Sequence, residues 1–300
     1  MRPMRLRQRW MKGCRSTTSP GGRRQELEDR ITDRPPVLIV LKYGGNAMAA
    51  PGSEDSTLDE VAALAARGDR IVLVHGGGPQ IDAELEAKKI DEVRIQGLRV
   101  TGRATRDVVE YVLCGTVNKA LVRALAARGS RAVGISGQDG HLLGARRAGT
   151  LGGVDLGYVG EITGVDPSAA RALLDAGFVV VVAPLALDAS GGALNCNADS
   201  AAGAIAGALA ADAFVVITNV SGVRRDRDDP ASLIERLTIA EAEALIADGT
   251  LTNGMIPKMR AAIGAVRAGA KRAVVAGAGF GAIDAALCGL GTELISSEFP

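Results

Sequence analysis

Short apolar runs alternate with helix-like patterns from Val37 to the C-terminal end of the chain. Such runs are typical of strands in a parallel sheet whose two faces are both covered by helices. The predicted strands are residues 37–41, 70–74, 131–135, 178–183, 214–218 and 272–275. The pattern therefore predicts an α/β fold, namely a three-layer αβα sandwich with an open, mainly parallel central sheet.

Helical periodicity fills most of the segments between these strands. The predicted helices are residues 56–66, 105–128, 239–248, 255–268 and 280–287, with three more that begin at Pro79, at Pro167 and near Asp199. Ser53 or Ser56 is the predicted N-cap of the first helix. Residues 93–101 are predicted to be extended, and the glycine-rich stretch from 136 to 163 to form hairpins.

Composition and charge narrow the possible partners. A chain of 300 residues with 47% hydrophobic content can bury one large core or two modest ones. A net charge of +1 gives no reason to expect binding to nucleic acid or to a membrane surface. No apolar run approaches the roughly 18 residues that a spanning helix needs.

The spacing of the cysteines argues against a zinc-binding protein and against a disulfide-stapled one. The four cysteines are far apart in the chain, and they form no Cys-x-x-Cys pair. They are Cys14, Cys114, Cys196 and Cys288. This spacing predicts neither a zinc site nor a disulfide framework, so it favours a reducing compartment such as the cytoplasm.

Residues 1–36 differ from the rest of the chain. Residues 1–24 contain eight arginines or lysines and no acidic residue. The segment lacks the apolar stretch of a secretory signal peptide. It is expected to be a disordered basic tail, with an organelle transit peptide or a start codon assigned too far upstream as the alternatives.

Lys42 ends the first predicted strand, and Gly44 and Gly45 follow it closely. A lysine beside exposed backbone N–H groups at the carboxyl end of a central strand suits a multiply charged anion such as phosphate. The alternative is an ordinary glycine turn on the surface. Two further glycine clusters, at residues 76–78 and at Gly222, also follow predicted strands. Because such strand ends meet at one edge of the sheet, the clusters are expected to converge on one crevice, with Lys42 and Lys258 as its cations.

Three familiar motifs are absent or incomplete. No Gly-x-x-x-x-Gly-Lys-Ser/Thr sequence is present, so the chain has no P-loop. Residues 277–282 approximate the dinucleotide-binding fingerprint, but too few residues follow for the next strand and its acidic residue. Residues 75–78 (His-Gly-Gly-Gly) are similar to an esterase oxyanion loop, but the Gly-x-Ser-x-Gly nucleophile elbow is missing.

Two polar sets have both a structural and a functional interpretation. Asn195, Asn197 and Asp199 alternate where a helix begins, and helix capping accounts for only one of them. Arg99 stands alone in an extended apolar stretch. It is either a solvated strand residue or a guanidinium fork that holds a carboxylate substrate.

Taken together, eight motifs make the chain resemble the amino acid kinase family, and within it the N-acetylglutamate kinases of arginine biosynthesis. The motifs occur in the family's order across residues 37–275. They are Lys-Tyr-Gly-Gly-Asn-Ala-Met (42–48), Val-His-Gly-Gly-Gly-Pro-Gln (74–80), Gly-Leu-Arg-Val-Thr (97–101), Val-Asn-Lys (117–119), Ser-Gly-Gln-Asp-Gly (136–140), Asn-Cys-Asn-Ala-Asp (195–199), Asn-Val-Ser-Gly (219–222) and Gly-Met-Ile-Pro-Lys (254–258).

The resemblance implies a reaction and a role for each motif. ATP would phosphorylate the side-chain carboxylate of N-acetyl-L-glutamate directly, without a covalent intermediate, and Mg²⁺ would be carried on the ATP phosphates. Lys42 and Lys258 would stabilise the transferred phosphoryl group, and Asp199 would orient both lysines. Residues 37–200 would form the lobe that binds the acetylated amino acid, and residues 201–300 the ATP-binding lobe.

The remaining site residues are also assigned by resemblance. Those implied to bind phosphate are Gly44, Gly45 and Gly76. Those implied to bind the acetylated amino acid are Gly77, Gly78, Arg99 and Asn195. Those implied to bind the nucleotide are Asn219, Val220, Ser221, Gly222, Val223, Arg224, Asn253, Gly254 and Met255. No protein metal site is expected.

Departures from the family pattern keep other functions open. Gly102, Asn219 and Asn253 stand where relatives usually carry other residues. One alternative is a kinase for α-aminoadipate, acetylated or attached to a carrier protein. Another is a sensor that binds nucleotide or amino acid without catalysis. Residues 276–300 lack the segment associated with arginine-sensitive hexamers, so a homodimer is expected.

Overall fold

The computed structural model describes residues 34–44, 55–226, 228–252, 254–279 and 281–296. Residues 36–300 form one compact unit. The predicted basic tail lies almost entirely outside the described residues, as do Ser53, Gly45 and Asn253.

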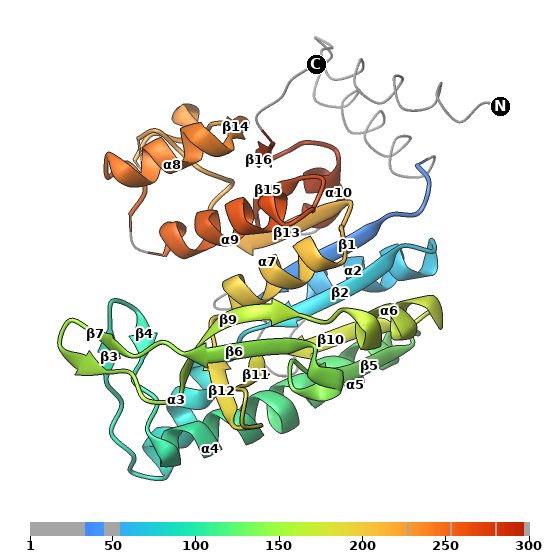
Figure 1. The fold of residues 1–300 in the computed structure, drawn as a ribbon. Coiled ribbons are helices and arrows are strands. Elements are labelled where there is room, and N and C mark those ends of the chain that lie inside the picture. Colours follow the sequence, from blue (N-terminus) through green and yellow to red (C-terminus); the bar gives the residue numbers. More distant parts are fainter. Residues whose placement is uncertain (1–33, 45–54, 227, 253, 280, 297–300) are drawn as a thin grey trace. The chain divides into compact units, whose positions relative to one another are not determined.

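The compact unit is built on an eight-stranded sheet. Its strand order is β14 (Arg236–Thr238), β16 (Thr292–Ile295), β15 (Ala273–Gly277), β13 (Ala213–Thr218), β1 (Leu38–Tyr43), β2 (Arg70–His75), β10 (Val179–Ala183) and β5 (Ala132–Ser136). Neighbouring strands are parallel except β15 and β16. Strand β1 pairs with β13 on one side and β2 on the other, so it lies inside the sheet (Figure 1).

Helices cover both faces of this sheet, as the apolar strands require. Successive residues of β1 belong to opposite cores: Val40 packs in one apolar cluster and Ile39 in the other. The first cluster includes residues of α6 (Ser168–Asp175), α7 (Ala198–Ala208), α8 (Ile239–Ala247) and α9 (Met255–Arg267). The second includes residues of α2 (Ser56–Ala66), α3 (Gly78–Ala87), α4 (Arg103–Tyr111), α5 (Asn118–Ala127) and α10 (Ala282–Leu287). The predicted three-layer αβα architecture is confirmed.

A second set of strands lies beyond the end of β10. Four strands close on one another in the order β11 (Leu185–Leu187), β12 (Ala193–Cys196), β9 (Val159–Val165) and β6 (Leu143–Arg147). Two small hairpins accompany them, β3–β4 (Arg94–Ile95 and Leu98–Arg99) and β7–β8 (Thr150–Leu151 and Val154–Asp155). The extended stretch 93–101 therefore turns back on itself, with positive φ at Gln96 and Gly97.

Two local predictions were wrong. The helix predicted over residues 105–128 begins at Arg103 and is interrupted by a π-helical stretch, Val112–Val117. The N-cap of α2 is Asp55 rather than Ser56, because the Asp55 carboxylate accepts hydrogen bonds from the N–H groups of Thr57 and Leu58. None of the helices in the described residues is long and apolar enough to cross a membrane.

Candidate active site at the ends of the central strands

Two lysines and one aspartate meet at the carboxyl end of the sheet, and we call them the lysine cluster. Lys42 Nζ lies 3.2 Å from Asp199 Oδ1, and Lys258 Nζ lies 3.8 Å from Asp199 Oδ2. The side chain of Lys42 is 9% exposed, that of Asp199 8% and that of Lys258 18%. Residues that are more than fifty positions apart in sequence thus share one largely buried carboxylate.

Local structure explains why these side chains converge. The alternation of β1 places Lys42 on the same face as Val40, the face against which α7 packs. Asn197 caps α7 by accepting hydrogen bonds from the N–H groups of Asp199 (2.8 Å) and Ser200 (3.1 Å). Capping therefore accounts for Asn197, while Asp199 occupies the first turn and extends toward the lysines.

The lysine cluster carries more positive than negative charge. Burial lowers the pKa of Lys258, the charge of Asp199 opposes that effect, and the nearby charge of Lys42 adds to it. Asp199 Oδ1 is buried and accepts no hydrogen bond among the described residues, although it is ion-paired with Lys42. Two ammonium groups beside one carboxylate leave a surplus positive charge, which attracts an anion.

Gly44 has no room for a side chain because it faces backbone, whereas a side chain on Gly77 would have to displace the end of Leu113. A Cβ on Gly44 would lie 2.9 Å from the backbone N of Gly76 and 3.8 Å from Lys42 Nζ. A Cβ on Gly77 would lie 2.6 Å from Leu113 Cδ2. The ends of β1 and β2 therefore approach each other at backbone distance, immediately beside the lysine cluster. Gly78, by contrast, faces open space at the first turn of α3.

His75 holds the glycine loop in place. It is fully buried, and burial lowers its pKa to about 4, so the imidazole is neutral. Its Nδ1 lies 2.8 Å from the Gly76 carbonyl oxygen, to which it donates, and its Nε2 accepts from the Asn118 amide at 3.2 Å. Asn118 in turn donates to the carbonyl of Val181 at 3.0 Å. The sequence motifs contained His75 and Asn118, but this positioning role emerges only from the structure.

Arg99 and Asn195 lie close together, joined through Thr101. The Asn195 amide donates to Thr101 Oγ1 at 3.2 Å, and that hydroxyl donates to the Arg99 carbonyl at 2.8 Å. Asn195 lies on β12, two residues before Asn197 and three before the start of α7. Two of the four residues implied to bind the acetylated amino acid, Arg99 and Asn195, thus belong to one hydrogen-bonded unit.

The Arg99 side chain belongs to a second group of charges, which we call the arginine cluster. Arg99 pairs with Asp82 and, at 2.8 Å, with Glu92. Arg94 pairs with the same two acids, at 2.9 Å from Asp82. Burial alone would raise the pKa of Asp82, but hydrogen bonding and charge from Arg99, with the charge of Arg94, outweigh it and lower the pKa. Asp82 and Glu92 were not predicted as site residues from the sequence, because no motif marks either acid.

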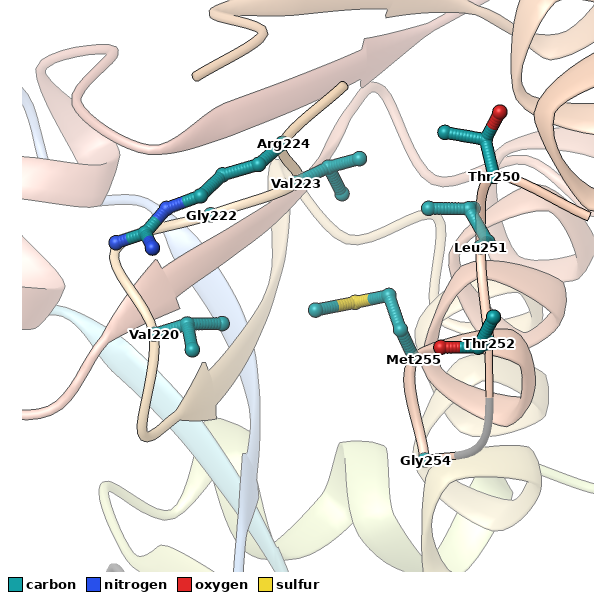
Figure 2. A pocket seen from close by; sticks show the side chains of 9 residues that line it. All are labelled: Val220, Gly222, Val223, Arg224, Thr250, Leu251, Thr252, Gly254 and Met255. Carbon is teal, nitrogen blue, oxygen red and sulfur yellow. The ribbon is translucent and has the colours of Figure 1, made fainter. Parts of the chain in front are cut away.

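A pocket of about 260 Å³ lies beside the first turn of α9, the helix that carries Lys258. Figure 2 shows one wall made by Val220 and residues 222–224 and the opposite wall by residues 250–252, with Met255 reaching between them. The implied nucleotide residues that line it are Val220, Gly222, Val223, Arg224, Gly254 and Met255. Asn219 and Ser221 are not among the lining residues. The pocket adjoins the lysine cluster through α9, where Lys258 Nζ donates to the Gly254 carbonyl at 3.3 Å.

The described residues do not fit a protein-bound metal or a thiol nucleophile. They contain no group of three or more His, Cys, Asp or Glu side chains arranged to hold a metal ion. Asp199 is already committed to two ammonium groups. Burial raises the pKa of Cys114 to about 11 and that of Cys196 to about 12, so both thiols stay protonated near neutral pH.

A family model and the similar sequences agree on the family of this chain. The model of the family described as "Amino acid kinase family" matches residues 37–277. The chain is 44% identical over 235 residues to the acetylglutamate kinase of Thermosynechococcus vestitus, covering 78% of this chain and 79% of that protein. It is also 44% identical over 237 residues to the chloroplastic acetylglutamate kinase of Arabidopsis thaliana, covering 79% of this chain and 68% of that protein.

Solved structures share the fold. An N-acetylglutamate synthase from Neisseria gonorrhoeae, complexed with coenzyme A and N-acetyl-glutamate, superposes with a TM-score of 0.76 at 26% identity, covering 94% of this chain and 65% of that one. Carbamate kinase from Giardia lamblia bound to AMP-PNP gives a TM-score of 0.64 at 20% identity, covering 87% and 99% of the two chains. At that identity the second likeness concerns the fold alone.

Proposed function

Since this chain belongs to the amino acid kinase family, we propose that its cleft transfers the terminal phosphoryl group of ATP to the side-chain carboxylate of N-acetyl-L-glutamate. The products are N-acetyl-L-glutamyl 5-phosphate and ADP. The protein is thus an acetylglutamate kinase, a phosphotransferase of arginine biosynthesis. The acetylglutamate kinases that share 44% identity over most of the chain support this assignment.

One observation carries the proposal beyond family membership. Asp199 joins Lys42 and Lys258 beside the close approach of Gly44 and Gly76. Lys258 contacts Gly254 of the 260 Å³ pocket, and Asn195 of the Arg99–Asn195 unit lies on β12, just before the helix that carries Asp199. A carboxylate acceptor bound near Arg99 and Asn195 and a phosphoryl donor bound in the pocket would meet at the surplus positive charge.

The reaction requires neither a protein nucleophile nor a general base. A carboxylate is already ionised and nucleophilic near neutral pH, so it attacks phosphorus in line without a general base. The protein's contribution is to position both substrates and to offset charge on the transferred group. We assign the charge-stabilising role to Lys42 and Lys258 and the role of orienting them to Asp199. Gly44, Gly45, Gly76, Gly77 and Gly78 are assigned to phosphoryl oxygens and substrate.

The two ends of the cleft suit different substrates. A guanidinium fork is the preferred partner of a planar carboxylate, so Arg99 is assigned to the α-carboxylate of the acetylated amino acid, with Asn195 beside it. The pocket of Figure 2 is assigned to ATP, through the lining residues together with Asn219, Ser221 and Asn253. Magnesium would enter with the ATP phosphates, because the described residues offer no cluster of ligands for it. When bound there, it neutralises phosphate charge.

The arginine cluster bears on the alternative substrates. A substrate linked to a carrier protein calls for a basic groove, but the charges of Arg94 and Arg99 are balanced by Asp82 and Glu92. This neutrality favours a free, small acceptor. Acetylated α-aminoadipate, which is one methylene longer, remains the second candidate within the same chemistry. A sensor without catalysis is disfavoured because Lys42, Asp199 and Lys258 are all present and in contact.

The test is release of ADP by the purified full chain with ATP and magnesium. N-acetyl-L-glutamate should support turnover at a higher kcat/KM than N-acetyl-L-α-aminoadipate. A reversed preference would assign the protein to the longer substrate. Nucleotide binding without turnover on either compound would make it a sensor.

Three further assignments complete the proposal. We assign residues 37–200 to the amino-acid lobe and residues 201–300 to the ATP lobe. We expect a homodimer, to be checked by light scattering of the purified protein. We expect it to act in the cytoplasm, to be checked by fluorescence microscopy of the full chain carrying a C-terminal tag.

A further inference from the structure

Glu60 is a buried acid that the proposed reaction does not use. It lies on α2 with 5% of its surface exposed, and burial raises its pKa to about 7. Among the described residues it pairs with no cation, since the Arg67 guanidinium at the end of α2 is bonded to Asp284 at 2.6 Å. Buried carboxylates of this kind reduce stability, because the charged form is poorly solvated.

The partners of Glu60 are two backbone groups at the start of α10. The N–H of Asp284 donates to Oε1 at 2.6 Å, and the N–H of Ile283 donates to Oε2 at 3.1 Å. These contacts cross more than 220 positions of sequence and tie α2 to the segment after β15. Helix α10 is only six residues long, so these two hydrogen bonds are a large part of what fixes its first turn.

The segment between β15 and α10 is in turn packed against the nucleotide loop. The N–H of Ala278 donates to the Thr218 carbonyl at 2.8 Å, at the end of β13. A Cβ on Gly277 would lie 3.2 Å from Ser221 Cα and 3.3 Å from the Val220 carbonyl oxygen, so the two backbones touch. Val220 lines the nucleotide pocket.

We propose that Glu60 is a positioning residue for nucleotide binding: its carboxylate fixes the first turn of α10 and, through Gly277 and Ala278, the loop that carries Val220. The inference rests on the proposed function of that pocket as the ATP site. Glu60 reaches the pocket only through backbone contacts, so it touches neither substrate nor the lysine cluster.

The same arrangement makes nucleotide affinity depend on pH. A protonated Glu60 retains one strong acceptor for two N–H donors, so the hold on α10 weakens as pH falls through about 7. The charged groups that face it are Asp284 on α10 and Arg67 on α2. On the other packed elements, Arg128 after α5 is paired with Asp59, and Arg70 of β2 with Asp175.

The experiment measures binding of ADP and, separately, of N-acetyl-L-glutamate to the full chain by calorimetry between about pH 6 and about pH 8. Glu60→Gln imitates the protonated side chain. Asp59→Asn is the matched control, because it removes the neighbouring carboxylate of α2, which faces Arg128 instead. At the higher pH, Glu60→Gln should bind ADP about three- to tenfold more weakly than wild type, the equivalent of one hydrogen bond. At the lower pH the two should converge, and Asp59→Asn should follow wild type throughout.

Two more variants keep the test decisive. Glu60→Asp keeps the charge but is too short for both N–H groups, so it should weaken ADP binding at the higher pH even if Glu60→Gln does not fold. Gly277→Ala should weaken ADP binding at both pH values and retain the wild-type pH dependence. Wild-type ADP affinity in Glu60→Asp or in Gly277→Ala would overturn the proposal. So would an equal loss of N-acetyl-L-glutamate binding in Glu60→Gln, because it would make Glu60 merely structural. Wild-type protein that fails to bind ADP at all would overturn the proposed function itself.

Discussion

The two charged clusters of the cleft are built from similar parts but balanced differently. In the lysine cluster, two ammonium groups share the single carboxylate of Asp199. In the arginine cluster, Arg94 and Arg99 are matched by two acids, Asp82 and Glu92. The first cluster retains a net positive charge and the second has none. This difference in net charge agrees with the group that each cluster is assigned to bind. Negative charge is spread over several oxygens of the phosphoryl group during its transfer, whereas the carboxylate of the amino acid carries a single charge.

The two clusters also differ in burial. Asp199 is 8% exposed, whereas Asp82 and Glu92, which each pair with both arginines, are 42% and 26% exposed. Charges in the lysine cluster are therefore screened less by water and should matter more per residue. The predictions below test this ranking, beginning with the largest effect.

Removing either lysine should have the largest consequence. Lys42→Ala and Lys258→Ala each delete a preorganised charge worth roughly 3–4 kcal/mol in the transition state, which lowers kcat about 10²–10³-fold. Steady-state kinetics with both substrates saturating measures the loss. Lys271→Ala, an exposed lysine paired with Asp212, serves as the control and should retain activity. Near wild-type turnover in both cluster variants would contradict the assignment of the site.

Asp199→Asn should lower kcat about tenfold to hundredfold, because two buried ammonium groups then repel each other without a counter-charge. It should also move the pH profile. Lys258 acts as a cation, so activity is lost as pH rises through its pKa, which burial has already lowered from its usual value. The charge of Asp199 opposes that shift, and its removal lowers the pKa further. The alkaline limb of the kcat profile should therefore move to lower pH, and an unmoved limb would argue against the coupling.

Arg99→Ala should act mainly on substrate affinity. Loss of a charge-assisted hydrogen bond worth about 1.5–3 kcal/mol raises the KM for N-acetyl-L-glutamate roughly ten- to hundredfold, with a smaller effect on the KM for ATP. Arg94→Ala is the matched control, because it removes a guanidinium that pairs with the same two acids but is more exposed. Equal effects of the two variants on both KM values would show that the cluster acts as a whole and that Arg99 has no special role.

Asp82→Asn should have the smallest effect and the opposite sign. It removes a competitor for the Arg99 guanidinium, but a half-exposed ion pair is worth only about 1 kcal/mol or less. The KM for N-acetyl-L-glutamate should therefore fall about two- to threefold. A rise in this KM would instead identify Asp82 as a group that holds Arg99 in place.

The fold could be predicted from sequence where one physical signal dominated. The apolar runs of β1, β2, β10 and β13 left no alternative to doubly covered strands. The short strands β11, β12, β14 and β16 were not predicted, because three or four residues carry no readable periodicity. The π-helical stretch from Val112 to Val117 was missed for a related reason: it leaves the apolar pattern of the surrounding helix intact.

Some residues of the candidate site could be identified from the sequence, and others could not. Lys42, Asp199 and Lys258 could be named from sequence, because each belongs to a motif by which the chain resembles the amino acid kinase family. Asp82, Glu92 and Glu60 could not, since they are acids on ordinary helical or loop segments. Their importance depends on partners that lie between two and 224 positions away.

The sequence by itself determined the class of sheet, the glycines that its strand ends require and the identity of the charged groups, because these depend on neighbours along the chain. Only the tertiary structure decided which charges are shared, which are balanced and which are left without a counter-ion. Those properties depend on distance and burial, and the parallel sheet sets both when it brings the ends of β1, β2 and β13 to one edge.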